Sequence, residues 1–187
     1  NVRKCLDHAL AVSKGLGFRT TDLDHQMGWC EFGEGDEMIA VLGHLDVVPE
    51  GEGWTFDPFG GEIRDGKIFG RGSMDDKGPT MAALRDSGLL LKRRIRILFG
   101  TNEETGSNDM KYYKSHGGEL PVMGFTPDGE YPVINGEKGI INVNYEADYT
   151  QTGDVRLTKI SGGSAPNVVP ASARAEITCP DDMKPQL

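Results

Sequence analysis

The sequence predicts an α/β fold, a three-layer sandwich on a mixed, largely parallel β-sheet, followed by the start of a smaller α+β domain with an antiparallel sheet. Residues 38–42 are continuously apolar and residues 94–99 resemble them, as expected of strands covered on both faces. Segments with helical spacing alternate with these strands, which favours a layered α/β architecture. Near residue 139 the pattern changes to alternating apolar and polar residues, which predicts the second part.

The individual elements of the first part follow from spacing and from breaker residues. Apolar residues at helical intervals predict an amphipathic helix over residues 2–16, stopped by nearby glycines. Pro79, suited to the first turn of a helix, begins a second helix predicted over residues 79–91. Three further strands are expected, at residues 18–23, 28–32 and 122–125.

We assign residues 1–138 to the first domain and residues 139–187 to the second. In residues 141–148 every second side chain is apolar, which predicts a half-buried strand with one face in solvent. Similar patterns at residues 155–161 and 173–179 predict the rest of an antiparallel sheet. Because the chain starts at an asparagine and reaches its last residue without an evident closing element, we expect a fragment or a sequence with parts missing.

The charge of the chain argues against a nucleic-acid partner. Its 29 acidic and 20 basic residues give a net charge of −9, and no basic stripe is interleaved with aromatic residues. No apolar run approaches the roughly 20 residues that cross a bilayer, and no signal peptide is evident, so we expect a cytoplasmic protein that does not bind membranes. Cys5, Cys30 and Cys179 lie far apart, which predicts free thiols.

Four polar clusters follow strand-like segments and suggest a catalytic site. They are GHLDVVPEG from residue 43, SMDDKG from residue 73, TNEETG from residue 101 and TPDGE from residue 126. In α/β proteins, functional residues gather at the carboxyl ends of the strands. One imidazole and several acids at that edge are the donors that hold divalent metal ions in a cleft. The clusters therefore predict a metallohydrolase.

Each cluster also has a structural interpretation. His44 and Asp46 can form a solvated pair, an acid before a helix can cap it, and Glu103–Glu104 can form a charged surface turn. Two adjacent acids repel each other, however, and Asp75–Asp76 are better explained if one faces a metal and the other faces solvent or Lys77. In the Glu-Glu pair, one acid can bind a metal while its neighbour moves a proton on water.

Taken together, GHLDVVPEG, GRGSMDDKGP, TNEETGS and TPDGEYPV resemble the co-catalytic zinc peptidases of the aminoacylase and carboxypeptidase G superfamily. The resemblance is closest to their PepV-type bacterial dipeptidases and runs over nearly the whole chain. It implies that His44 and Asp128 bind one metal ion, that Asp75 bridges two, and that Glu104 binds the second.

The same resemblance implies further roles. Glu103 would be the general base, Asp46 would orient the ring of the histidine ligand, and the Asp75–Asp76 peptide would be cis. The second domain would be a lid, and GGSAPNVVP from residue 162 resembles the family's lid loop, whose asparagine, here Asn167, contacts substrate. A simple Gly/Pro turn between strands is the alternative for that loop.

The implied activity is hydrolysis of the peptide bond of dipeptides or other short peptides by a water that bridges two divalent metal ions. Zinc is the expected metal, with manganese or cobalt as alternatives. The protein is expected to be a monomer or a homodimer formed through the lid. One alternative is an N-acyl amino acid deacylase of the acetylornithine or succinyl-diaminopimelate type. Another is a catalytically incomplete metal-binding fragment, because the family's remaining ligand is a histidine beyond the lid and the interval from Asp75 to Glu103 is shorter than in the family.

Overall fold

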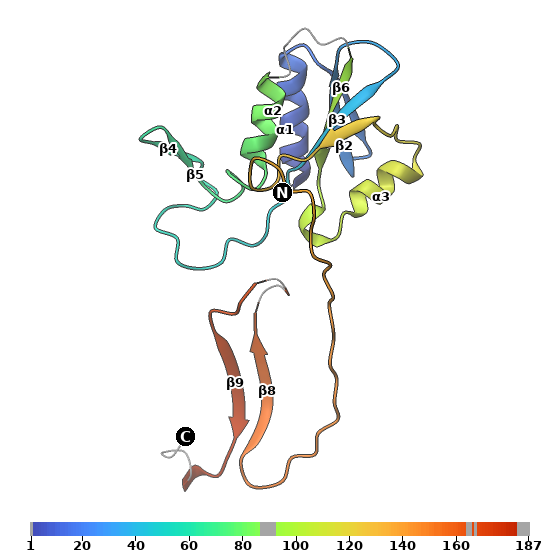
Figure 1. Ribbon diagram of the computed structural model, residues 1–187. Coiled ribbons are helices and arrows are strands. Elements are labelled where there is room, and N and C mark those ends of the chain that lie inside the picture. Colours follow the sequence, from blue (N-terminus) through green and yellow to red (C-terminus); the bar gives the residue numbers. More distant parts are fainter. Residues whose placement is uncertain (1, 87–92, 164–165, 167, 183–187) are drawn as a thin grey trace. The chain divides into compact units, whose positions relative to one another are not determined.

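The computed structural model describes residues 2–86, 93–163, 166 and 168–182 (Figure 1). By its contacts the chain divides into two compact units, Asn1–Ile134 and Asn135–Leu187. In chain order the elements are α1 (Val2–Gly15), β1 (Arg19–Leu23), β2 (Met27–Phe32), β3 (Met38–His44), β4 (Glu62–Arg64), β5 (Lys67–Phe69), α2 (Lys77–Asp86), β6 (Arg94–Gly100), η1 (Glu103–Thr105), α3 (Asn108–Ser115), β7 (Met123–Phe125), β8 (Arg156–Gly162) and β9 (Ala173–Thr178).

The first unit is built on a five-stranded mixed sheet in the order β1-β2-β6-β3-β7. β3 runs parallel to both of its neighbours, β6 and β7. β1 and β2 form a hairpin, and β2 pairs antiparallel with β6. This arrangement confirms the predicted mixed sheet and puts the strand with the longest apolar run between two parallel partners.

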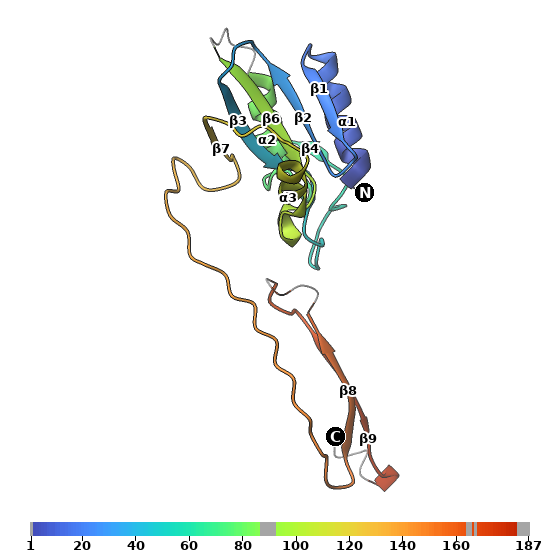
Figure 2. The ribbon, with the colours of Figure 1, turned by 90° about the vertical axis from the view of Figure 1, so that its right-hand side faces the viewer.

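Helices cover both faces of this sheet. Figures 1 and 2 show α1 and α2 on one face and α3 on the other. Alternate residues of β6 serve the two sides: Ile97 and Phe99 pack in a core with residues of α1 and α2, whereas Leu98 packs in a second core with Tyr113 of α3. The three-layer α/β architecture predicted from the sequence is therefore confirmed. Among the described residues, no helix has the length and apolar character that crossing a bilayer requires.

A network of four charged side chains ties the antiparallel side of the sheet to the segment after α3. Arg96, which is 7% exposed, donates to Glu31 at 2.8 Å and to Glu119 at 2.9 Å. Arg94 donates to the same two carboxylates, at 3.2 and 2.8 Å. Burial raises the pKa of the Glu31 carboxyl, but its hydrogen bonds with Arg96 and Arg19 and the charges of Arg96 and Arg94 together outweigh burial, so the pKa is lowered. The hydrogen bond with Arg94 likewise lowers the pKa of Glu119.

Most predicted elements of the first unit are present, with small shifts at their ends. α2 begins two residues before Pro79, and residues 87–91 of the predicted helix lie outside the described residues. The hairpin of β4 and β5 was not predicted. Its Asp65–Gly66 turn has positive φ at both residues, a pairing that is typical of two-residue hairpins. All three cysteines are free, as expected.

The second unit contains one antiparallel hairpin, β8 paired with β9, as predicted for residues 155–161 and 173–179. The prediction of a strand at residues 141–148 is wrong, because these residues have no regular secondary structure and are exposed. Alternating apolar residues supply a face that a strand can bury, but a strand also needs a neighbour for its backbone hydrogen bonds. In the described residues, 141–148 have no such partner.

Candidate metal centre

The predicted polar clusters converge at one edge of the central sheet. β3 ends at His44, whose register partner on β6 is Gly100, and the acidic turn η1 follows that strand. β7 runs parallel to β3 and leads into the loop of Asp128. Since parallel strands end on the same edge, these side chains come together from distant positions in the chain.

His44 is at the centre of the group. Its side chain is 3% exposed, and its Nε2 lies 3.0 Å from Asp75 Oδ1 and 3.4 Å from Asp128 Oδ2. The same nitrogen lies 4.0 Å from Glu103 Oε2. On the other side of the ring, Nδ1 lies 3.4 Å from Asp46 Oδ1 and 3.1 Å from the Asp46 carbonyl oxygen. The Nε2 atom of His44 thus faces acidic side chains from three separate segments of the chain.

Among the described residues, two groups of three donors that include His44 have the geometry to hold a cation. One adds Asp75 and Glu104, and the other adds Glu103 and Asp128; within each group the donor atoms lie within 4.8 Å of one another. Every predicted metal ligand takes part in one of the groups. Glu103, expected to be the base rather than a ligand, lies in the group of Asp128.

The Asp75–Asp76 peptide is cis, as the resemblance implies, and the two side chains have different surroundings. The side chain of Asp75 is 63% exposed and faces His44. Asp76 is fully buried, and its Oδ2 accepts the His44 backbone N–H at 3.2 Å and the Thr80 hydroxyl at 2.8 Å. The expectation that the second acid faces solvent or Lys77 is therefore wrong, because this carboxylate ties the end of β3 to α2.

Gly43 permits this close packing. A Cβ atom at residue 43 would lie 1.9 Å from Thr80 Oγ1 and 2.7 Å from Asp76 Oδ2. Any larger residue would push α2 away from the end of β3. The glycine that precedes His44 is therefore required by the contact between helix and strand.

Asp46 makes a second set of contacts in addition to its contact with His44. Its Oδ1 accepts the backbone N–H of Glu103 at 3.2 Å, and its Oδ2 accepts that of Glu104 at 3.1 Å. Glu104 Oε1 in turn accepts the backbone N–H of Val48 at 3.2 Å. Asp46 therefore joins the end of β3 to the acidic turn, a role that sequence analysis did not predict.

The close packing of charges shifts several pKa values. Burial lowers the pKa of His44, but its hydrogen bond with Asp46 and the nearby negative charges outweigh burial and raise it to about 9. Burial raises the pKa of Glu103, and Asp128 adds to the rise. Burial and Asp75 together raise the pKa of Glu104. For Asp46, His44 and the two amide donors outweigh burial, so its pKa is lowered.

The donor chemistry fits a divalent cation. Carboxylate oxygens and an imidazole nitrogen are the ligands that zinc and related metals accept in hydrolytic sites. Burial raises the pKa values of Glu103 and Glu104 and the neighbouring acids add to the rise, and a bound cation would offset the repulsion between these acids. The ring of His44 is fixed at Nδ1 by Asp46, which leaves Nε2 to face the acids.

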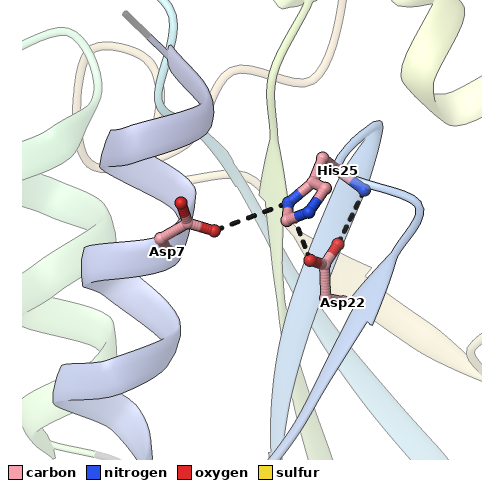
Figure 3. A group of neighbouring side chains, drawn as sticks. All are labelled: Asp7, Asp22 and His25. Carbon is pink, nitrogen blue, oxygen red and sulfur yellow. Dashed lines mark hydrogen bonds and ion pairs between the residues drawn. The ribbon is translucent and has the colours of Figure 1, made fainter.

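A third group, of Asp7, Asp22 and His25, has donor atoms within the same distance of one another (Figure 3). His25 Nδ1 lies 2.8 Å from Asp22 Oδ2 and 3.5 Å from Asp7 Oδ1. Asp22 also accepts the His25 backbone N–H at 2.8 Å, which shapes the turn between β1 and β2. More than half of the His25 and Asp7 side chains is exposed, so water screens these charges. This group is explained by the hairpin turn.

Three buried residues support the site from behind, and these supporting roles were not predicted from the sequence. Asp76, Thr80 and Asp109 are buried and bind the segments that carry the predicted donors. Asp76 and Thr80 are spaced as neighbours on a helix end, which is a detectable signal, whereas no local pattern marks Asp109. Asn167, the predicted substrate contact, lies outside the described residues.

Comparison with known proteins places the chain in a family. Residues 40–178 match the profile of Peptidase family M20/M25/M40. The chain belongs to this family. The predicted resemblance to co-catalytic metallopeptidases is thereby confirmed.

Two curated relatives are similar over nearly the whole chain. YtjP of Bacillus subtilis (strain 168) is 43% identical, over 96% of this chain and 40% of its own length. The β-Ala-Xaa dipeptidase of Lactobacillus delbrueckii subsp. lactis is 44% identical, over 92% of this chain and 38% of its own length. This chain therefore spans about two fifths of the length of these curated relatives.

The fold is shared with a solved M20 structure. The metallo-carboxypeptidase Sso-CP2 from Sulfolobus solfataricus superposes with a TM-score of 0.57 and 20% identity, over 69% of this chain and 32% of that chain. At this identity the likeness concerns the fold.

Proposed function

We propose that the protein carrying this M20 chain is a dinuclear metallopeptidase that hydrolyses the peptide bond of dipeptides or other short peptides. One observation carries the proposal: the buried Nε2 of His44 faces carboxylates from three separate segments at 3.0 to 4.0 Å. The substrate class is supported by the name of the Lactobacillus relative, a β-Ala-Xaa dipeptidase.

The resemblance of the four sequence clusters to co-catalytic zinc peptidases suggests how two metal ions would be held. His44 and Asp128 are the proposed ligands of one ion. Glu104 is the proposed ligand of the other, and Asp75 would contribute to holding both. We propose zinc, with manganese or cobalt as alternatives, because all three accept mixed imidazole and carboxylate ligands. When bound, such ions supply Lewis acidity, which activates water and polarises the scissile carbonyl.

Glu103 is the proposed general base. Its carboxylate lies beside the His44 and Asp128 donors, and its pKa is raised by burial and by Asp128. A base whose pKa is closer to the working pH can both accept and return a proton. Glu103 takes a proton from the attacking water and delivers it to the nitrogen of the leaving amine as the C–N bond breaks. Asp46 keeps the His44 ring in place through Nδ1.

The remaining parts of the proposal concern the whole protein. Residues 1–138 belong to the catalytic domain and residues 139–187 to a lid, in which Asn167 contacts the substrate. The protein is located in the cytoplasm and acts as a monomer or as a homodimer formed through the lid. The likeness of GGSAPNVVP to the family's lid loop supports the role of Asn167.

The test is a comparison of wild type with Glu103→Ala after loading with Zn²⁺, Mn²⁺ or Co²⁺. Dipeptides and N-acyl amino acids are assayed side by side, and metal content is measured by atomic emission. We expect dipeptide cleavage by the wild type, and its loss in the variant with metal content largely retained. Cleavage of N-acyl amino acids alone would favour a deacylase, and undiminished turnover in the variant would refute the role of Glu103.

A further inference from the structure

Four consecutive backbone amides after β6 are bound by two carboxylates. The N–H groups of Thr101 and Asn102 donate to Asp109 Oδ2 at 2.6 and 3.1 Å. The next two, of Glu103 and Glu104, donate to the two oxygens of Asp46 at 3.2 and 3.1 Å. In the segment that carries the proposed base and a proposed metal ligand, Asp109 therefore binds the first two amides and Asp46 binds the next two.

Asp109 is built into the fold rather than exposed at its surface. It lies in the first turn of α3, is 4% exposed, and its Oδ1 accepts the N–H of Met110 at 2.7 Å. Gly100, at the end of β6, leaves room for it, because a Cβ there would lie 3.0 Å from Asp109 Oδ2. All of these hydrogen bonds come from backbone amides, and such bonds to an ionised acceptor are stronger than neutral ones.

The position of this carboxylate sets the course of the chain into the acidic turn. Asp109 fixes the amides of Thr101 and Asn102, and the two glutamates follow directly. Rotation about the bonds of those two residues would swing the glutamate side chains away from His44. Reacting groups must be held to within about 0.5 Å, and a displacement of about 1 Å can cost 100-fold in rate.

We propose that Asp109 is a positioning residue for the Glu103–Glu104 pair and acts through the backbone of Thr101 and Asn102. This inference rests on the proposed function, because the placement of the two glutamates is what hydrolysis would use. The competing explanation is that Asp109 only stabilises the start of α3, where a negative charge is favoured. The two explanations predict different kcat values for variants that are all fully folded.

The experiment compares Asp109→Ala and Asp109→Asn with Tyr113→Phe in the metal-loaded protein. Tyr113 is a matched control, because it lies on the same helix, is 1% exposed, and makes buried hydrogen bonds with Arg96 and Glu119 away from the acidic turn. We measure kcat and KM at a temperature where all variants are folded. Backbone hydrogen exchange of residues 101–104 is measured in parallel.

For Asp109→Ala we expect kcat to fall roughly 10- to 100-fold with KM changed by less than about twofold, the range known for residues that orient a metal site. Exchange at residues 101 and 102 should speed up by roughly tenfold or more, because strong hydrogen bonds are lost. Asp109→Asn should recover part of both effects, since its amide oxygen can still accept the two N–H groups. Tyr113→Phe should keep the wild-type kcat and exchange in this segment.

Wild-type kcat and unchanged exchange in Asp109→Ala would overturn the inference. So would an equal loss of kcat in Tyr113→Phe, because that result would assign the loss to the stability of α3. A wild-type protein without hydrolytic activity would instead sink the proposed function. In that case the exchange data alone would still decide whether Asp109 holds the segment. If Asp109→Ala does not fold, Asp109→Asn replaces it in both measurements.

Discussion

Replacing Gly43 with alanine should destabilise the protein strongly. The new Cβ would lie 1.9 Å from Thr80 Oγ1, whereas carbon–oxygen contacts normally lie beyond about 3.3 Å. Either α2 or Thr80 must move by roughly an ångström or more, and such overpacking costs about 1–3 kcal/mol. Moving the Thr80 hydroxyl also breaks its bond to the buried Asp76, which costs about 1–3 kcal/mol more. We expect a total loss of about 2–6 kcal/mol in the free energy of unfolding.

Urea unfolding of the metal-free protein measures this loss, with Gly15→Ala as the matched control. No atom lies within 4 Å of a Cβ at residue 15, so that variant should unfold at the wild-type midpoint or above it. Thr80→Ala removes the closest of the clashing atoms, so Gly43→Ala should cost less stability in the Thr80→Ala background than in wild type. Part of the loss should remain, because Asp76 Oδ2 at 2.7 Å and the Cβ of residue 80 at 3.0 Å still crowd the new side chain. A wild-type midpoint for Gly43→Ala would refute the reasoning. Equal additional losses with and without Thr80 would show that this contact is not the cause.

Two further predictions concern charge. Because the folded pKa values of Glu31 and Glu119 are lowered, their ion pairs should stabilise the protein fully above the ordinary value of 4.5 and progressively less as pH falls below it. The difference in urea midpoint between wild type and Glu31→Gln should therefore shrink on acidification from pH 7 to pH 3, and a constant difference would contradict this. His44→Asn should remove the imidazole nitrogen that is common to the two donor groups around His44. It should therefore lower zinc affinity by at least about 100-fold in a chelator competition titration. In the same titration His25→Asn should bind as wild type, and a comparable loss there would move the metal site to the hairpin turn.

Much of the first unit could be predicted from local patterns. The apolar run of residues 38–42 predicted a strand covered on both faces, and β3 lies between two parallel neighbours. The polar residues that follow it predicted a site at the carboxyl edge, where His44 meets Asp75 and Asp128. Strand type and edge position follow from spacing and connectivity, so these inferences need no knowledge of distant contacts.

The errors came where a residue's surroundings depend on packing between elements. Whether Asp76 faces solvent or α2 is decided by Thr80 and Gly43, which sequence patterns do not bring together. The alternating residues 141–148 satisfy the pattern of a strand, yet pattern alone does not supply a hydrogen-bonding neighbour. Asp109 binds amides that precede it by several residues, and no spacing rule marks that contact.

Both donor groups around His44 come from residues 44 to 128, within the first unit alone. All the donors described in these two groups are thus supplied by one unit, while the hairpin of β8 and β9 belongs to the other. Substitutions confined to the hairpin unit therefore change none of the side chains of these two groups, so the two units can be altered by mutagenesis one at a time.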